Sequence, residues 1–536
     1  MTRPDLIREG LARGWRVLGG PQGPWPDRLT CDVLIVGTGA GGGITADLLT
    51  AAGLDVLIVE EGPLKSASNF TGLERDAYPA LYQEAAGRRT ADRAIGILQG
   101  RCVGGSTTVN WTSSFRTPAS TLAFWRERFG LTDLTPETLA PWFEQVERRL
   151  SIERWPVAPN ANNERLRTGA SKLGIATDII ARNVKGCWDL GNCGLGCPTQ
   201  AKQSMLVTTL PAALDRGARL LVQCRAERIE WSPDGRVSAV VLQPVHLNGS
   251  VAGEATRVSA RHVVLAGGAI NTPALLMRSS APDPYRLLGR RTFLHPVAAS
   301  VALFEERIAG WSGAPQSVYS DHFLETVPVD GPIGFKLEAP PLYPVIAATT
   351  LPGIGSGYAS LLRDFEHTQA LLALLRDGFH ASSPGGTVRL RRDGSAMLDY
   401  PLNDYLLDGV RRAWLAMAEI QFAAGASKVL SVHEGAGPWL TWDQAKRAIS
   451  GLASEPSTLR LLSAHVMGGC MLAPTPERGI TRPDGQHWQI GNLSIHDGSL
   501  FPTSIGANPQ LSVYAVVARL AAALAARLTG RQVALA

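Results

Sequence analysis

The sequence predicts an α/β protein with a Rossmann-like nucleotide-binding domain, and three observations near its start carry this prediction. A short apolar run bounded by glycine is typical of a buried parallel strand. Gly37, Gly39 and Gly42 follow it in G-x-G-x-x-G spacing and open a segment of helical pattern. A second apolar run, 54–59, leads into the acid Glu60. This order of strand, glycine turn, helix, strand and acid favours dinucleotide binding over a purely structural glycine turn.

Each residue of this fingerprint has a physical task. Gly37 permits the tight turn, Gly39 lets a pyrophosphate approach the backbone, and Gly42 lets the helix pack closely on the strand. The helix N-terminus then faces the phosphate charge. Glu60 stands where an acid accepts hydrogen bonds from an adenosine ribose, and an acid there disfavours the 2′-phosphate of NADP. FAD and NAD remain as candidates.

Composition sets the broad class. A chain of 536 residues is expected to form two domains, and 45% hydrophobic with 18% charged residues describes a globular protein. The net charge of +5 arises from interleaved acids and bases, which gives no support for nucleic-acid binding. The N-terminus lacks the apolar region of a signal peptide, and the alanine-rich stretch 511–528, interrupted by Arg519, favours a buried helix over a membrane span. With seven cysteines, these features favour a reducing compartment and a cytoplasmic location, with peripheral attachment to the inner membrane left open.

The order of motifs predicts that the nucleotide domain is discontinuous. Segments of cofactor-binding character return at 100–110, 262–280 and 491–512, with unrelated sequence between them. We expect the nucleotide domain to comprise residues 1–120, 205–295 and 462–536. Residues 121–204 and 296–461 are expected to form an inserted substrate-binding or cap domain.

Four motifs resemble those of the glucose–methanol–choline (GMC) oxidoreductases. They are the fingerprint, GRCVGGSTTVN at 100–110, GAINTPALLMRSS at 268–280, and the pair SAHVMGGCM at 463–471 with DGSLFPTSIGANPQLS at 497–512. The third motif, at 268–280, ends in Ser-Ser where Ser-Gly is usual in the family. Four motifs in the family's order are far more specific than one. The resemblance implies a Rossmann-like FAD-binding domain and an α+β substrate domain built on an antiparallel sheet.

The resemblance also implies a catalytic pair, His465 and Asn508. Oxidation of an alcohol needs a hydride acceptor, which flavin N5 supplies, and a base for the hydroxyl proton. Histidine has the ordinary pKa nearest neutral pH, so His465 is the candidate base, against the alternative of a core histidine. The amide of Asn508 can hydrogen-bond the substrate oxygen without competing for the proton, and Asn at this position resembles the choline and cholesterol branches. His295, His487 and His496 are expected to be structural or surface residues.

The same resemblance implies which residues hold FAD. Beyond the fingerprint they are Gly100, Gly104, Gly105, Ser106, Asn110, Asp497, Gly498 and Pro509. Pro509 suits the first turn of a helix whose N-terminus would face the flavin N1–C2 region, where negative charge collects on reduction. Val109 stands where choline oxidase carries the histidine that attaches FAD. Non-covalent FAD is therefore expected.

Three cysteines lie close together in the chain, and their role stays open. Cys187, Cys193 and Cys197 are spaced C-x5-C-x3-C, which resembles the iron–sulphur loop of FAD-dependent sugar dehydrogenases in the same family. Similar loops occur in long-chain alcohol oxidases, and three thiolates are fewer than the usual four ligands. Buried thiols or one disulfide are the alternative.

These inferences predict an FAD-dependent enzyme that oxidises the CH–OH group of a hydrophobic alcohol, long-chain or alicyclic, to an aldehyde or ketone. The stretch 370–390 resembles the long-chain alcohol oxidase branch, and the C-terminal motifs resemble cholesterol oxidase. The alternatives are a sugar or polyol dehydrogenase that passes electrons through a cluster to a cytochrome or quinone, a hydroxynitrile-type lyase, and a non-catalytic flavin-binding protein. The sequence leaves open the particular alcohol, the electron acceptor (oxygen, a quinone or a protein) and the oligomeric state.

Overall fold

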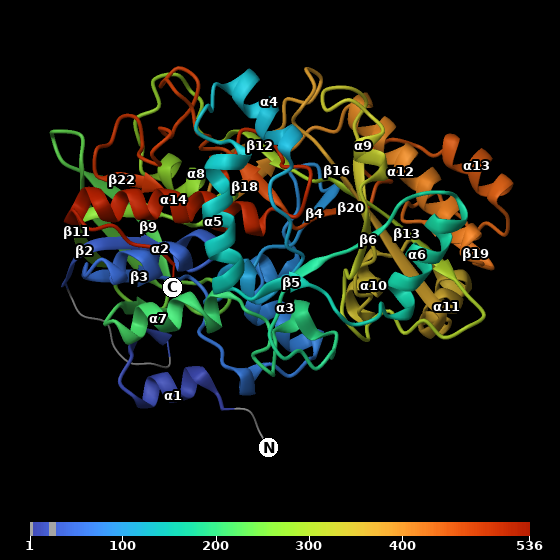
Figure 1. The fold of residues 1–536 in the computed structure, drawn as a ribbon, viewed down its shortest axis with the longest axis horizontal. Helices are drawn as coiled ribbons and strands as arrows, with labels where there is room; N and C mark the ends of the chain where they lie inside the picture. Colours follow the sequence, from blue (N-terminus) through green and yellow to red (C-terminus); the bar gives the residue numbers. More distant parts are fainter. Residues whose placement is uncertain (1–3, 21–27, 536) are drawn as a thin grey trace.

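The computed structural model describes residues 4–20 and 28–535, and two eight-stranded sheets form its centre (Figure 1). The first sheet, on the left of Figure 1, has the order β1-β8-β3-β2-β11-β10-β9, with β22 beside β11. Its strands are β1 Arg16–Leu18, β2 Arg28–Val36, β3 Val56–Val59, β8 Arg219–Leu221, β9 Cys224–Trp231, β10 Val237–Pro244, β11 Thr256–Leu265 and β22 Leu493–Ile495. All pairs are parallel except those of β10 with β9 and β11. This confirms the predicted Rossmann-like sheet.

Helices cover this sheet, and its parallel strand β3 is apolar along its whole length. All four residues of β3 are buried, as the continuous apolar run predicts. Helix α2, Ala40–Ala51, packs on β2 and β3 and also against α14, Gln510–Thr529. By length and composition α14 is the one described helix that could cross a membrane, but 72% of its apolar window is buried inside the protein. This confirms the prediction of a buried C-terminal helix.

The second sheet, on the right of Figure 1, is antiparallel except for one pair of strands, as the resemblance implies. Its order is β4-β20-β13-β16-β15-β14-β6, with β19 beside β13. The strands are β4 Ile95–Ile97, β6 Asp178–Ile179, β13 Val297–Leu303, β14 Val318–Ser320, β15 Phe335–Glu338, β16 Thr368–Leu375, β19 Lys428–Ser431 and β20 Leu461–Ser463. The sheet is thus assembled from segments far apart in the chain.

Two smaller sheets and the remaining helices complete the described fold. The four-stranded sheet has the order β18-β17-β12-β21, with bounds β12 Arg290–Leu294, β17 Gly386–Leu390, β18 Ala396–Asp399 and β21 Val466–Gly468. A two-stranded sheet pairs β5 Ile152–Arg154 with β7 Ala181–Asn183. The other helices are α1 Leu6–Ala12, α3 Glu74–Leu81, α4 Ala119–Phe129, α5 Pro136–Arg149, α6 Ala161–Lys172, α7 Thr209–Asp215, α8 Gly268–Arg278, α9 His322–Glu325, α10 Pro344–Thr350, α11 Gly355–Arg363, α12 Asp404–Ala423 and α13 Trp442–Ser450.

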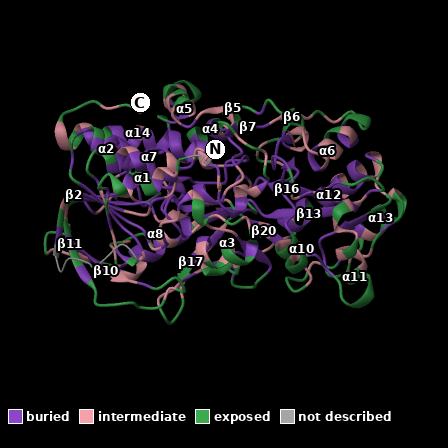
Figure 2. Ribbon diagram, turned by 90° about the horizontal axis from the view of Figure 1, so that it is seen from below, coloured by how far each residue is buried: buried purple, intermediate pink, exposed green. Residues whose placement is uncertain are grey.

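The two faces of the second sheet bury different sets of side chains. Successive residues of a strand point to opposite faces, so alternate positions form separate clusters. Ala298 and Ala302 of β13 and Leu371 of β16 pack on one face with α12. Their neighbours along the same strands form another apolar cluster on the opposite face. Figure 2 shows buried residues running through both sheets and exposed residues confined to the periphery.

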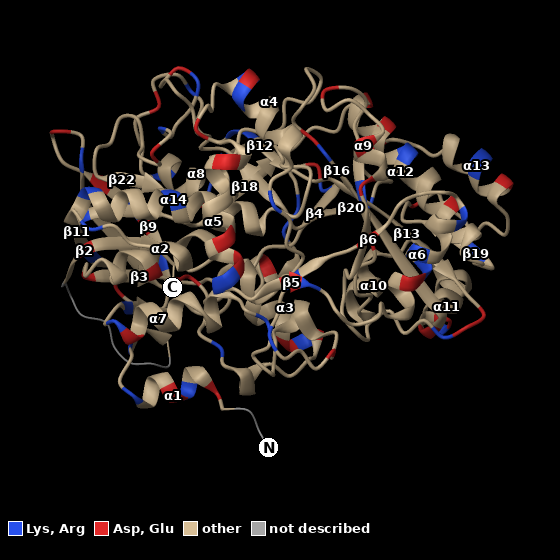
Figure 3. Cartoon of the chain, viewed as in Figure 1, with Lys and Arg blue, Asp and Glu red and all other residues tan. Residues whose placement is uncertain are grey.

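Acidic and basic residues alternate along the ribbon over the whole molecule, as the sequence predicts (Figure 3). The predicted domain boundaries stay a prediction. Helices α4 and α5, which lie in a segment predicted to belong to the cap domain, contribute Trp125, Leu139 and Phe143 to the hydrophobic core of the first sheet. Helix α5 also packs directly on α14.

Candidate active site

One cavity of about 1170 Å³ connects the glycine fingerprint to the second sheet. This volume slightly exceeds the usual range of about 300–1,000 Å³ for small-molecule and cofactor sites. Ten of the predicted cofactor residues line it, together with His465 and Asn508: Gly37, Gly39, Glu60, Gly100, Gly105, Ser106, Asn110, Asp497, Gly498 and Pro509. The structure therefore brings together in one cavity residues that lie far apart in the chain.

The fingerprint glycines divide into those packed against protein and one that faces open space. Gly37 has a φ of +105°, and a Cβ there would lie 2.3 Å from the carbonyl oxygen of Ala266. A Cβ on Gly42 would lie 1.9 Å from the carbonyl oxygen of Gly37, so this glycine allows helix and turn to pack. A Cβ on Gly39 would come no nearer than 3.9 Å, to Gly105. The free space at Gly39 and the N-terminus of α2 fit the pyrophosphate of a dinucleotide.

Glu60 is held rigidly at the end of β3. One carboxylate oxygen accepts hydrogen bonds from the backbone N–H and the hydroxyl of Thr38, and the other accepts the N–H of Gly62 at 2.9 Å. Burial raises the pKa of Glu60 despite these three donors. The arrangement fixes the carboxylate beside the fingerprint turn, where the sequence places the ribose.

The other predicted cofactor residues connect loops around the cavity. Asp497 accepts hydrogen bonds from the N–H of Gly268 at 2.9 Å and from the N–H of Ser499 at 2.8 Å, which joins two predicted motifs. Asn110 donates to the side chain of Gln510, the first residue of α14, at 2.6 Å. Pro509 is the N-cap of α14 and so precedes the helix by one residue. Gly104 lies outside the cavity lining and has a φ of +88°.

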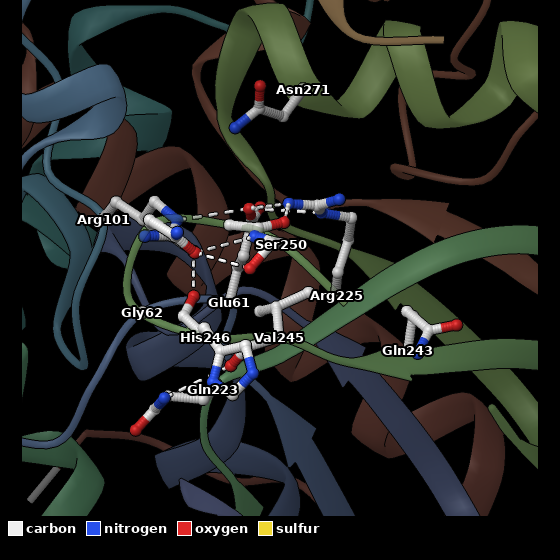
Figure 4. A network of polar contacts seen from close by, with 12 residues as sticks. Glu61, Gly62, Arg101, Gln223, Arg225, Gln243, Val245, His246, Ser250 and Asn271 are labelled. Atoms are coloured by element: carbon white, nitrogen blue, oxygen red, sulfur yellow. Dashed lines mark hydrogen bonds and ion pairs between the residues drawn. The ribbon is translucent and has the colours of Figure 1, made fainter. Parts of the chain in front are cut away.

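An ion-pair network near Glu60 was not predicted from the sequence (Figure 4). The carboxylate of Glu61 accepts from Arg101 at 3.1 Å and from Arg225 at 3.0 Å, and all three residues line the cavity. Burial raises the pKa of Glu61, but the two guanidinium groups outweigh this effect and lower it. The only sequence signals were an acid directly after Glu60 and an arginine within the motif at 100–110, because the third member comes from β9.

Strand register places His295 opposite His465. Strand β12 pairs with β21 through Leu294 and Val466, and β13 pairs with β20 through Val297 and Leu462. His295 lies between β12 and β13, and His465 lies between β20 and β21. The antiparallel pairing therefore brings the two histidines together across the turn from one sheet to the next.

The two rings are joined by a hydrogen bond of 2.9 Å between their Nδ1 atoms. The N–H of Gly506 donates to Nε2 of His295 at 3.2 Å, which ties the pair to the loop that carries Asn508. Burial lowers the pKa of His465 to about 4, and burial together with His465 and Lys336 lowers that of His295 well below its ordinary value. His465 is therefore neutral at neutral pH. His295 was expected to be structural or at the surface, but it contacts the candidate base.

A buried carboxylate lies behind Asn508. The amide nitrogen of Asn508 donates to Glu338 of β15 at 3.2 Å, while the amide oxygen has no partner among the described residues. Burial raises the pKa of Glu338 to about 7, against the attraction of Lys336. Lys336 is itself fully buried and forms an ion pair with Asp321. No motif pointed to Glu338.

The structure does not gather the three cysteines of the loop into a metal site. Among the described residues, no group of three or more His, Cys, Asp or Glu side chains could hold a metal ion. Cys187 accepts the N–H of Asp189 at 3.4 Å, Arg182 donates to Cys193 at 3.6 Å, and Cys197 pairs with the hydroxyl of Thr199. All three thiols are free. The iron–sulphur cluster thus has no support in the arrangement of its candidate ligands.

Sequence comparison identifies the family. Two GMC oxidoreductase domain profiles match residues 78–297 and 381–517. An uncharacterized GMC-type oxidoreductase of Sinorhizobium fredii is 30% identical over 92% of this chain and 95% of its own length. The chain belongs to the GMC oxidoreductase family. A long-chain-alcohol oxidase of Arabidopsis thaliana is 29% identical over 91% of this chain and 68% of its own length.

Solved structures share the fold of this GMC oxidoreductase. A formate oxidase superposes with a TM-score of 0.69 at 16% identity, covering 94% of this chain and 99% of its own. A pyridoxine 4-oxidase gives a TM-score of 0.68 at 18% identity, over 92% and 98% of the two chains. Family and fold together identify an FAD-dependent oxidoreductase that acts on alcohol-type substrates.

Proposed function

We propose that this GMC oxidoreductase oxidises the CH–OH group of a hydrophobic alcohol, long-chain or alicyclic, to an aldehyde or ketone. The observation that carries the proposal is the apolar wall of the cavity beyond His465 and Asn508. Alternate residues of two neighbouring strands line it: Val297, Ala299 and Val301 of β13, and Ala370, Leu372 and Leu374 of β16. An alcohol that packs on this wall would remove its hydrocarbon part from water, which favours binding by about 25 cal/mol per Å² of apolar surface.

The wall continues onto α10 and the segment before it, so the hydrocarbon region has more than one side. Leu342, Ile346, Ala347 and Leu351 line the cavity from this segment. Residues 339–362, which include α10, contain no Asp, Glu, Lys, Arg or His. A sugar or polyol would leave its hydroxyl groups without partners against such a surface, and this would cost binding energy for each group. The lining therefore favours a fatty or alicyclic alcohol over a carbohydrate.

The residues of this chain have distinct proposed roles. When bound, FAD supplies the hydride acceptor, and its phosphates, ribose and flavin would be held by the fingerprint, Glu60 and the loops at 100–110 and 497–510. His465 acts as the base for the hydroxyl proton, and Asn508 positions the alcohol oxygen. Val109 lines the cavity and has no nucleophilic atom, which supports non-covalent binding of FAD.

The alternatives predicted from the sequence receive less support. A sugar dehydrogenase with an iron–sulphur relay is disfavoured by the apolar wall that β13, β16 and α10 form in the cavity. It is also disfavoured because the described residues gather no set of cluster ligands. A hydroxynitrile-type lyase would share His465 and Asn508, so the residues alone do not separate it from an oxidase or dehydrogenase. The reaction itself separates them, because the lyase reaction leaves the flavin oxidised.

The experiment is anaerobic mixing of the FAD-bound protein with a panel of alcohols while the flavin absorbance is followed. Bleaching by fatty or alicyclic alcohols is the expected result. Bleaching by sugars alone would favour the sugar dehydrogenase. If no alcohol bleaches the flavin, the proposed oxidation is wrong. Reoxidation in air, compared with reoxidation by quinones, then tests which electron acceptor the enzyme uses.

A further inference from the structure

The hydrogen bonds around His295 fix the positions of protons in the catalytic pair. His295 is 1% exposed, so water does not compete for its ring nitrogens. Its Nε2 accepts the N–H of Gly506, and its Nδ1 lies 2.9 Å from Nδ1 of His465. His465 lines the cavity, and its Nε2 is the ring nitrogen with no protein partner among the described residues.

A backbone N–H only donates, so Nε2 of His295 must be an unprotonated acceptor. A neutral imidazole carries one proton, which in His295 must therefore lie on Nδ1. This proton is donated to Nδ1 of His465, which must be unprotonated. The proton of neutral His465 therefore lies on Nε2, the nitrogen left for the cavity. The lowered pKa of both rings agrees with a neutral pair.

We propose that His295 is a positioning residue that sets the tautomer of His465, so that the resting enzyme presents an N–H donor to the alcohol oxygen. The proposal rests on the proposed role of His465 in alcohol oxidation. It adds that His465 first binds the alcohol as a donor and becomes a base only in the second tautomer of the pair.

In the second tautomer the pair holds the same number of protons. His295 has passed its Nδ1 proton to Nδ1 of His465, Nε2 of His465 has lost its proton to solvent in the cavity, and one proton from solvent has bonded to Nε2 of His295, where it meets the N–H of Gly506. Nε2 of His465 is then free. The alcohol O–H bond breaks, its electron pair stays on oxygen, its proton bonds to Nε2 of His465, and the pair gains one positive charge. Two buried N–H groups then face each other without an acceptor. An unsatisfied buried donor costs about 1–3 kcal/mol, so this tautomer is at least about fivefold scarcer than the resting one.

Two substitutions of similar size separate the tautomers. The carboxylate in His295→Asp only accepts, so Nδ1 of His465 must donate and Nε2 becomes free. The negative charge also raises the pKa of His465. The amide in His295→Asn is neutral and donates from the place of the imidazole Nδ1, so His465 keeps its proton on Nε2. His295→Asn is therefore the matched control.

Nitrogen-15 NMR of the full-length, FAD-bound protein labelled at histidine identifies the tautomer directly, because protonated and unprotonated ring nitrogens have different chemical shifts. The signal of His465 is identified by its loss in His465→Gln. We expect a proton on Nε2 of His465 in the parent and in His295→Asn, and on Nδ1 in His295→Asp. A parent His465 protonated on Nδ1, or a tautomer unchanged in His295→Asp, would overturn the proposal. If His295→Asp does not fold, the parent spectrum alone decides.

Failure of the proposed function is distinguishable from failure of this inference, because the spectrum needs no substrate. If His465→Ala reduces its flavin at the parent rate, the catalytic role of His465 is wrong. The NMR spectrum then tests the tautomer assignment by itself. If that role holds, His295→Asp should reduce its flavin at least about fivefold faster than His295→Asn. The rate of His295→Asp should also decrease as the pH drops below the raised pKa of His465. Equal rates with equal pH profiles in the two variants would contradict the proposal.

Discussion

Asn508 donates a hydrogen bond of 3.2 Å to Glu338, a carboxylate buried behind the candidate active site. An ionised carboxylate only accepts, so this contact directs the amide nitrogen toward Glu338 and leaves the amide oxygen as the unpartnered atom. Lys336 and Asp321 are the charged groups that act on Glu338. Within the site Glu338 therefore has a pKa of about 7, whereas His465 has a pKa of about 4.

Glu338→Gln should remove a pH dependence that centres near pH 7. In the parent protein the ionised carboxylate orients Asn508, and protonation weakens this control. We therefore expect the KM for alcohol to change across about pH 6–8 in the parent and to stay constant in the variant. Stopped-flow reduction at a series of alcohol concentrations and pH values measures this. A parent profile that is flat, or identical in the variant, would count against the role of Glu338.

The same group should make stability depend on pH. The pKa of Glu338 is raised from 4.5 to about 7, so its stabilising protonation is fully present below pH 4.5 and is lost as pH rises through about 7. Protonation of Glu338 contributes about 3 kcal/mol at most to the free energy of unfolding. Denaturation across this window should therefore show a steeper loss of stability in the parent than in Glu338→Gln. Parallel curves would contradict the buried-carboxylate account.

Gly39→Val should yield folded protein with little FAD. The space at this glycine is open, because an added Cβ comes no nearer than 3.9 Å to another residue, but the valine side chain would occupy the path of the pyrophosphate. FAD per chain and the thermal unfolding of the protein are the measurements, with Gly39→Ala expected to be intermediate. Gly37→Val is the contrast, because it clashes with the backbone and should reduce folding itself. Full FAD content in Gly39→Val would refute the placement of the pyrophosphate beside Gly39.

The sequence predicted those parts of the fold and site that depend on local patterns. Apolar runs and glycine spacing locate β2, α2 and β3, and short motifs name His465 and Asn508. His295 and Glu338 lie in segments without a motif. Their positions depend on the pairing of strands β12, β13, β20 and β21 and on the packing behind Asn508. The low pKa of His465 also depends on burial in the folded chain, so its ordinary value near neutral was a poor guide.

Chain length of the alcohol should control kcat/KM through the apolar wall. Each added methylene that reaches the wall is worth about 0.8 kcal/mol, or about fourfold in kcat/KM. In Ala299→Phe the larger side chain fills space beside β13, so kcat/KM should stop rising at a shorter chain length than in the parent. The kcat/KM for short alcohols and the FAD content should change little. Steady-state kinetics with a homologous series of primary alcohols measures both slopes. No length dependence in the parent would contradict the hydrophobic substrate.

Anaerobically purified protein should contain less than about 0.2 iron atoms per chain, since a cluster of three or four irons would far exceed this level. The three loop thiols have other contacts and form no ligand group in the described chain. Metal analysis with an absorbance spectrum checks this. Stoichiometric iron, lost in Cys193→Ser, would restore the cluster hypothesis.

The most direct test of the account is anaerobic reduction of the flavin by a long-chain alcohol in the parent protein and in His465→Ala. Positioned acid–base groups contribute about 10²–10⁴-fold, so the variant should retain FAD and reduce it slower by that factor, or about 3–5 kcal/mol. Asn508→Ala should slow the reaction less, because it removes a hydrogen bond and leaves the base. Reduction of His465→Ala at the parent rate would contradict the assignment of His465 as the residue that takes the hydroxyl proton.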